Sequence, residues 1–139
     1  MPPITRTYVK TALVYLVLAL MGGVFVTLRP VAQLVPWIAA FTPLYFHFFM
    51  VGWVTQLIMG IAYWMFPRKS KQQPRGSERL AWAAYWLLNL GLVLRLVAEP
   101  ALTLTPLALW SWLLILSATL QWLGGACFVA NTWPRVKEK

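Results

Sequence analysis

Four long apolar segments dominate this chain of 139 residues and constrain its fold more than any other feature. They cover residues 9–28, 37–66, 80–98 and 106–132. Each reaches the ~20 residues that an α-helix needs to cross the hydrocarbon core of a bilayer. Charged residues make up only 11% of the chain, whereas about a quarter of the residues in a soluble domain are charged. The sequence therefore predicts an integral membrane protein.

The connections between these segments are short. Residues 29–36 and 99–106 carry a proline near each end, and prolines suit helix ends because their missing N–H is not needed there. The polar segment 67–79 contains the turn residues Pro74-Arg-Gly76, and Ser77 is a candidate N-cap of the third helix. Short connections place successive helices antiparallel. We therefore expect an all-α, transmembrane up-down four-helix bundle that forms a single membrane domain over the chain.

Basic residues gather on one side of this expected bundle. Ten of the twelve fall there: Arg6, Lys10, Arg68, Lys69, Lys71, Arg75, Arg79, Arg135, Lys137 and Lys139. This positive-inside pattern predicts that both termini are cytoplasmic, and we expect a multi-pass protein of the bacterial inner (plasma) membrane. The net charge of +9 therefore indicates topology and not nucleic-acid binding.

His47 is the only histidine, and it lies in the segment 41–67, which has no charged side chain. An ionisable group inside hydrocarbon is a functional hypothesis by default. No carboxylate is near it in sequence, so the strongest candidate partner of a neutral imidazole is a metal, which in a bilayer most often means haem iron. The alternative is a hydrogen bond to a carbonyl or hydroxyl of a neighbouring helix. Pro43 is expected to widen the helix beside the imidazole, about ten residues below the helix start.

The rest of this helix carries a stripe of small and polar residues. At about 100° per residue, Gly52, Gln56 and Gly60 fall on roughly the opposite face from His47. Small residues four apart let two helices approach closely, and a polar side chain among them can bond across the contact. We expect a helix-packing seam, with contact of Gln56 to a cofactor or quinone as the alternative.

From His47 to Pro67 the chain reads His-x₄-Gly-Trp-x₂-Gln-x₃-Gly-x₂-Tyr-Trp-x₂-Pro. This stretch resembles helix two of subunit I in the haem–copper oxidase superfamily, most closely in the nitric oxide reductase and cbb3-type branches. It is also weakly similar to haem-binding membrane proteins of the NnrS type. The resemblance implies that His47 is an axial ligand of a low-spin haem b iron. It also implies a helix that descends from the outer face.

The chain departs from that family in the residues it lacks. Without further histidines it cannot build a high-spin haem with an adjacent metal, so we do not expect oxygen or nitric oxide reduction by this chain alone. The second axial ligand could come from His47 of a second copy across a two-fold axis, from another subunit, or from a methionine. The methionines considered are Met21, Met50, Met59 and Met65, of which the last three share the helix of His47 and are wrongly directed. We favour a second chain, identical or not.

Arg95 lies four residues before Glu99, near the outer end of the third helix. The simplest interpretation is an ion pair between residues four apart on one helix. The functional interpretation is that Arg95 binds a haem propionate, because propionates usually point to the nearer water face and arginine grips a carboxylate with two parallel bonds.

Other residues indicate contacts between helices. Asn89 and Gln121 are expected to form interhelical hydrogen bonds, and Gly91, Gly124 and Gly125 are expected to be points of close packing.

Several classes of function are excluded by what the sequence lacks. The first helix has no carboxylate, so a proton-coupled multidrug exporter on four helices is not expected. Haem c, zinc, iron–sulfur and phosphate-loop motifs are absent from the sequence, as is a nucleophile–base pair. A cleaved signal peptide is the alternative for residues 9–28, but this stretch is too long and has no A-x-A-like site after it.

These observations lead to one main expectation and two alternatives. We expect a cytochrome b-like protein that binds haem b in the lipid bilayer and serves electron transport, as a homodimer or within a larger membrane redox complex. The first alternative is a cofactor-free structural or accessory subunit of such a complex. The second is a haem-handling or gas-handling sensor or assembly factor.

Overall fold

The computed structural model describes residues 1–28, 41–69 and 74–136. Its elements are α1 (Pro3–Thr27), α4 (Thr42–His47), the π-helix η1 (Phe48–Thr55), α5 (Gln56–Met65), α6 (Glu78–Leu104), α7 (Ala108–Thr132) and the 3₁₀ turn η2 (Trp133–Arg135). Because α4, η1 and α5 follow one another without a break, we call them together helix two. The described ranges contain no β-strand. Four helices are long and apolar enough to cross a membrane, which confirms the all-α transmembrane prediction.

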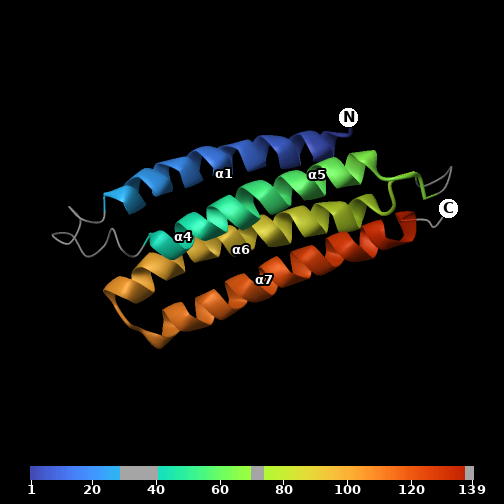
Figure 1. Cartoon of the computed structure of the whole chain (residues 1–139). Helices are drawn as coiled ribbons and strands as arrows, with labels where there is room; N and C mark the ends of the chain where they lie inside the picture. Colours follow the sequence, from blue (N-terminus) through green and yellow to red (C-terminus); the bar gives the residue numbers. More distant parts are fainter. Residues whose placement is uncertain (29–40, 70–73, 137–139) are drawn as a thin grey trace.

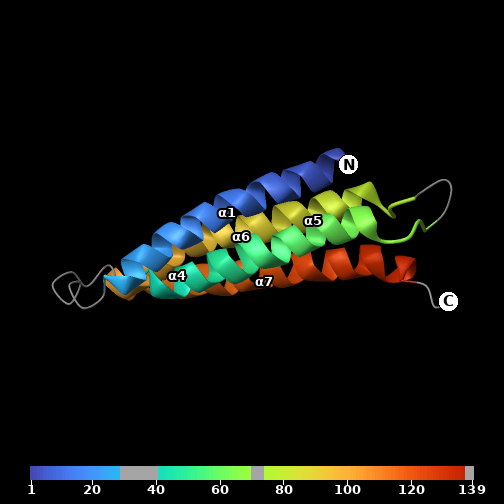
Figure 2. The ribbon, with the colours of Figure 1, turned by 45° about the horizontal axis from the view of Figure 1, so that its top comes forward.

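The four long helices lie side by side and alternate in direction (Figure 1). The N-terminus and the end of α7 share one end of the bundle, which we call the terminal end, and the opposite end is the loop end. Helix two packs along α1, and α7 packs along α6. Smaller contacts of α6 with α1 and helix two join these two hairpins. Figure 2 shows the same up-down arrangement from a second direction.

Two helices begin elsewhere than predicted. α1 begins at Pro3 and not at residue 9, because a proline is well tolerated in the first turn of a helix. Within the described residues helix two begins at Thr42, which places Pro43 in the first turn. The missing N–H of Pro43 therefore costs no helical hydrogen bond. The helix does become wider beside His47, but through the π-helix that begins at Phe48 and not through this proline. His47 is the sixth residue of the described helix, closer to the loop end than the expected ten residues.

α6 continues to Leu104, past its predicted end at residue 98, and contains Pro100. Membrane helices tolerate an internal proline where threonine side chains or neighbouring helices satisfy the freed backbone groups. The carbonyl that Pro100 deprives of its helical donor is that of Leu96, and one turn later the Thr103 hydroxyl donates to the Glu99 carbonyl at 3.2 Å. The expectation that residues 99–106 form a loop is therefore wrong for most of that segment.

The N-terminus of α6 is capped as predicted. The hydroxyl of Ser77 accepts a hydrogen bond from the backbone N–H of Leu80 at 3.4 Å, and Glu78 lies in the first turn. The backbone N–H of Ser77 donates to Oδ1 of Asn131 at 2.7 Å. This bond ties the start of α6 to the end of α7.

The predicted glycine seam of helix two packs against α1. A Cβ atom on Gly52 would lie 2.6 Å from Cγ of Tyr15, and a Cβ on Gly60 would lie 2.6 Å from Cβ of Tyr8. Neither tyrosine atom is at the flexible end of its side chain. The two glycines therefore set how closely α1 and helix two approach, which confirms the packing interpretation.

Polar side chains join the two hairpins. Gln56 is fully buried, and its Oε1 accepts a hydrogen bond from Nδ2 of Asn89 on α6 at 2.6 Å, which confirms an interhelical bond for Asn89. Gln121 instead donates to Ser117 within α7 at 3.1 Å. Ser117 makes the bond between helices, because its hydroxyl donates to the Gly91 carbonyl of α6 at 2.7 Å.

Among the three glycines expected to pack closely, Gly125 is the exception. A Cβ on Gly124 would lie 3.1 Å from the Ala84 carbonyl oxygen, whereas a Cβ on Gly125 would meet nothing within 4 Å. Gly125 lies on the outer face of α7 and not between α6 and α7, so that expectation is wrong for this residue.

We predict that Gly60→Ala lowers stability and that Gly125→Ala does not. A methyl group at position 60 forces α1 away from helix two, and such overpacking costs about 1–3 kcal/mol. Reversible unfolding in mixed micelles measures the difference. Equal unfolding free energies for the two variants would contradict the close approach at Gly60.

The terminal end is closed by Arg135, which is fully buried. Its Nη2 donates to the Phe66 carbonyl at 2.7 Å, and its Nε donates to the Pro67 carbonyl at 3.1 Å. The guanidinium also lies over the ring of Tyr63, 5.6 Å from the centroid. These carbonyls follow the last turn of α5, where a helix has no backbone donors left and where a positive charge is favourable.

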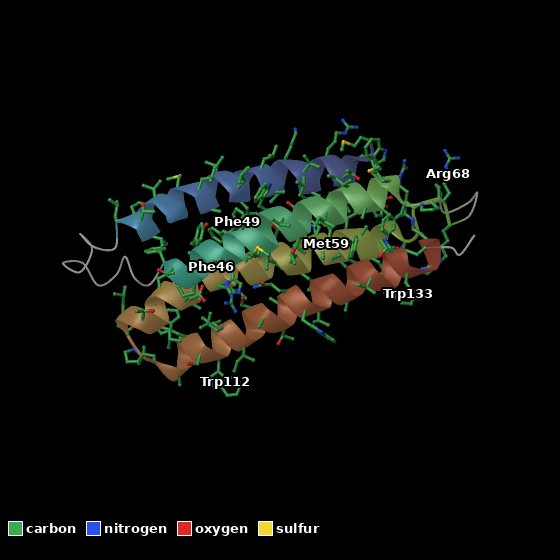
Figure 3. All side chains as sticks on the ribbon, in the orientation of Figure 1. Phe46, Phe49, Met59, Arg68, Trp112 and Trp133 are labelled. Atoms are coloured by element: carbon green, nitrogen blue, oxygen red, sulfur yellow. The ribbon has the colours of Figure 1, made fainter. Side chains whose placement is uncertain are left out.

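Tryptophans face outward near both ends of α7 (Figure 3). Trp112 lies towards the loop end and Trp133 at the terminal end, with 68% and 75% of their surfaces exposed. This placement agrees with the aromatic belts expected at the two interfaces of a membrane.

Candidate functional site

His47 is the last residue of α4 and stands directly before the π-helix η1. Its side chain is partly buried. Nδ1 lies 3.0 Å from the carbonyl oxygen of Pro43, one turn earlier, and 3.3 Å from Nη1 of Arg95 on α6. The two residues singled out in the sequence are thus brought into contact.

The two contacts of Nδ1 exclude one another. Nδ1 can carry the proton and donate to the Pro43 carbonyl, or it can accept a hydrogen bond from Arg95. The contact with Pro43 is the shorter one and gives the tautomer in which Nε2 keeps its lone pair. That is the usual state of a histidine that binds a metal through Nε2. Nε2 makes no hydrogen bond within the described part of the chain.

Arg95 and Glu99 form the ion pair that their spacing predicts. Nη1 of Arg95 and Oε1 of Glu99 are 3.1 Å apart, and only 15% and 13% of the two side chains are exposed. Nε of Arg95 and Oε2 of Glu99 are buried and have no partner among the residues that the structure describes. A buried polar atom without a partner is costly, so Arg95 Nε is well suited to donate to a further acceptor, such as a carboxylate.

The π-helix is the feature of the site that the sequence interpretation missed. η1 spans Phe48–Thr55, and the backbone N–H of Gln56 bonds back to the Val51 carbonyl five residues earlier. The hydroxyl of Thr55 donates to the Met50 carbonyl, also five residues earlier, at 2.8 Å. π-Helical turns are rare and are frequent at functional sites. No residue pattern considered in the sequence signals this change of helical period.

The π-helix also corrects the expected faces of helix two. His47 and Gln56 were expected on opposite faces, yet His47 contacts Arg95 and Gln56 bonds to Asn89, both on α6. The expectation is wrong because it assumed about 100° per residue throughout.

A metal centre with several ligands is not formed by the described residues. They contain no group of three or more histidine, cysteine, aspartate or glutamate side chains that could hold an ion. Met59 is buried in the core beside Tyr8 and Tyr63, whereas Met50 and Met21 are more than half exposed. A single axial ligand from this chain is the arrangement that these residues fit.

Comparison with known proteins gives one match. The model of a family described as Cytochrome C and Quinol oxidase polypeptide I matches residues 3–105, which include α1, helix two and α6. The matched region contains His47 and Arg95 and ends before α7 begins. Comparisons with curated proteins and with solved structures gave no match.

Proposed function

The chain belongs to the cytochrome c and quinol oxidase polypeptide I family, and we propose that it is a haem b-binding membrane protein of an electron-transfer or respiratory complex. His47 is the proposed axial ligand of the haem iron. The observation that carries this proposal is the orientation of its imidazole, with Nδ1 held 3.0 Å from the Pro43 carbonyl. Nε2 has no such partner in the described residues.

Bound haem would supply a one-electron carrier, whose potential depends on axial ligand, hydrogen bonds and burial. The chain's own contribution is to orient the ligand. The Pro43 carbonyl would hold the proton on Nδ1, fix the plane of the ring and raise the basicity of Nε2. The lack of any charged side chain in residues 41–67 keeps the surroundings of His47 apolar.

Arg95 is the proposed partner of a haem propionate. Its buried Nε lacks a partner among the described residues, so it can donate to a carboxylate while Nη1 keeps its bond to Glu99. A propionate that drew Nη1 away from His47 would also leave Nδ1 to the Pro43 carbonyl. The propionate would then both anchor the haem and favour the His47 tautomer in which Nε2 can bind iron.

We predict that Arg95→Gln weakens haem binding without abolishing it. Loss of a charge-assisted hydrogen bond costs about 1.5–3 kcal/mol, which is roughly tenfold or more in affinity. The haem midpoint potential should also fall, because a nearby positive charge favours the reduced state. Glu99→Gln, which keeps the guanidinium, is the control. Unchanged affinity and potential in Arg95→Gln would remove Arg95 from the site.

The second axial ligand is proposed to come from a second chain, identical or not. Met59 is buried in the core beside Tyr8 and Tyr63, and the sequence contains no other histidine than His47. Haem shared between two copies of His47 predicts one haem per two chains in the purified protein. One haem per chain would contradict sharing and require a ligand from elsewhere.

A cofactor-free accessory subunit is the second candidate function. The observation that favours it is that His47 already makes polar contacts within its own chain, to the Pro43 carbonyl and to Arg95. In that case the imidazole would link helix two to α6, and purified protein would contain no haem even after expression with ample haem.

The proposed setting is the inner membrane of a bacterium, with one membrane domain and both termini in the cytoplasm. The N-terminus and the end of α7 share an end of the bundle with Arg68, Lys69 and Arg75, which lie between helix two and α6 (Figure 1). An alkaline phosphatase fused to the C-terminus should be inactive. An active fusion would contradict the proposed orientation.

A further inference from the structure

We propose that the π-helix η1 stores one residue more than an α-helix would hold, and that this keeps His47 facing α6 beside Arg95. The inference concerns the helix register of the chain itself. Only its bearing on haem binding rests on the function proposed above.

The first observation is the direction of two side chains. His47 and Gln56 are nine residues apart, which in an α-helix is about 900° and places them on opposite faces. In the structure both side chains bond to α6, His47 to Arg95 and Gln56 to Asn89. The π-helix η1 spans all of the residues between them, and its turn of less than 100° per residue accounts for this shared direction.

The second observation is a mismatch in length between α1 and helix two. On the loop side of η1, a Cβ on Gly22 of α1 would lie 3.5 Å from Cβ of Tyr45. On its terminal side, a Cβ on Gly60 would lie 2.6 Å from Cβ of Tyr8. These two contacts are 14 residues apart in α1 and 15 residues apart in helix two. The partner helix α1 is α-helical throughout and helix two contains the π-helix η1, so we assign the extra residue to helix two.

The backbone of η1 shows where that residue is taken up. A turn closed by a bond to the fifth preceding residue holds one residue more than an α-turn. Thr55 supports the wider turn, because its hydroxyl donates to the Met50 carbonyl at 2.8 Å. At the first residue of η1, the ring of Phe48 packs edge-on against Tyr15 of α1, with ring centroids 5.2 Å apart.

A Cβ on Gly52 would also meet Tyr15, and the seven residues from Tyr45 to Gly52 match the seven from Tyr15 to Gly22. From Gly52 to Gly60 helix two has eight residues against the seven of α1 from Tyr8 to Tyr15, so the surplus lies between Gly52 and Gly60.

The inference predicts that η1 tolerates a deletion that α1 does not. Without Val54, which lies in η1 between Gly52 and Gly60, helix two can become a regular α-helix while its contacts with α1 stay in register. Without Val14, which is 58% exposed and lies between the same two contacts on α1, the ends of α1 turn by about 100° relative to each other. Both contacts cannot then be kept.

Disulfide formation measures the register directly. In a Cys127→Ala background, one variant carries Gly22→Cys with Tyr45→Cys and another carries Tyr8→Cys with Gly60→Cys. The Cβ atoms of the Gly22–Tyr45 pair lie 3.5 Å apart, within the range of a disulfide, whereas those of the Tyr8–Gly60 pair lie 2.6 Å apart. For the second disulfide α1 and helix two must therefore separate by roughly 1 Å to reach the ~3.8 Å that the bond requires. We expect both disulfides to form in membranes at unchanged yield after deletion of Val54, and at least one to be lost after deletion of Val14.

Loss of either disulfide after deletion of Val54 would overturn the proposal, as would retention of both after deletion of Val14. If the Val54 deletion does not accumulate in membranes, deletion of Trp53 in the same interval is judged by the same criterion, and its failure overturns the proposal. Haem content is measured in parallel. Absence of haem from the two disulfide variants without a deletion, with both disulfides formed, would count against the haem site at His47 and leave the register intact.

Discussion

His47→Ala is expected to abolish haem binding completely. His47 is the only histidine of the chain, and its imidazole has the hydrogen-bond pattern of an iron ligand, with Nδ1 towards the Pro43 carbonyl. Alanine offers no atom that can bind iron, and no neighbouring side chain among the described residues replaces it. The haem-to-protein ratio of the purified, detergent-solubilised variant measures the effect.

The matched control is Ile58→Ala, because Ile58 lies on the same helix and 58% of its surface is exposed. This variant should keep the wild-type haem content and the same stability. Haem retained at the wild-type ratio in His47→Ala would show that another residue or another subunit holds the iron. The role of His47 would then be limited to its contact with α6.

Arg135→Ala is expected to lower the free energy of unfolding by about 3 kcal/mol or more, because two charge-assisted hydrogen bonds are lost. The Phe66 and Pro67 carbonyls would be left at the end of α5 without their donor. The change also removes the cation that lies over the Tyr63 ring and opens space where a fully buried side chain stood. Unfolding in mixed micelles and protease sensitivity at the terminal end check this result.

Arg68→Ala is the control for charge, since Arg68 is exposed at the same end of the bundle (Figure 3). It should leave the unfolding free energy within a few tenths of a kcal/mol of the wild type. Arg135→Lys should recover only part of the loss, because an ammonium lacks the planar fork that reaches both carbonyls. Equal stability of Arg135→Ala and Arg68→Ala would contradict the closure of the terminal end by Arg135.

Much of the fold follows from the sequence because its main determinant is local. Four apolar segments of membrane length and short connections are enough to predict an up-down bundle, and Ser77 marks the start of α6. The helix ends were harder to predict. Pro43 and Pro100 both break helices in water, but one fits a first turn and the other is accommodated inside a membrane helix.

The sequence was enough to select the residues of the candidate site, but not to predict how they are arranged. A lone histidine and an arginine inside apolar segments are conspicuous, so His47 and Arg95 could be selected separately. Their contact, and the shared direction of His47 and Gln56, depend on the π-helix between them. No single-helix pattern at 100° per residue contains a π-helix, so the sequence interpretation could not place these side chains together.

The most direct test of the proposed function is the reduced-minus-oxidised absorption spectrum of the wild-type protein, purified after expression with ample haem. The proposal predicts a sharp low-spin b-type band that His47→Ala lacks. A spectrum without any haem band would contradict haem binding and favour the cofactor-free accessory subunit.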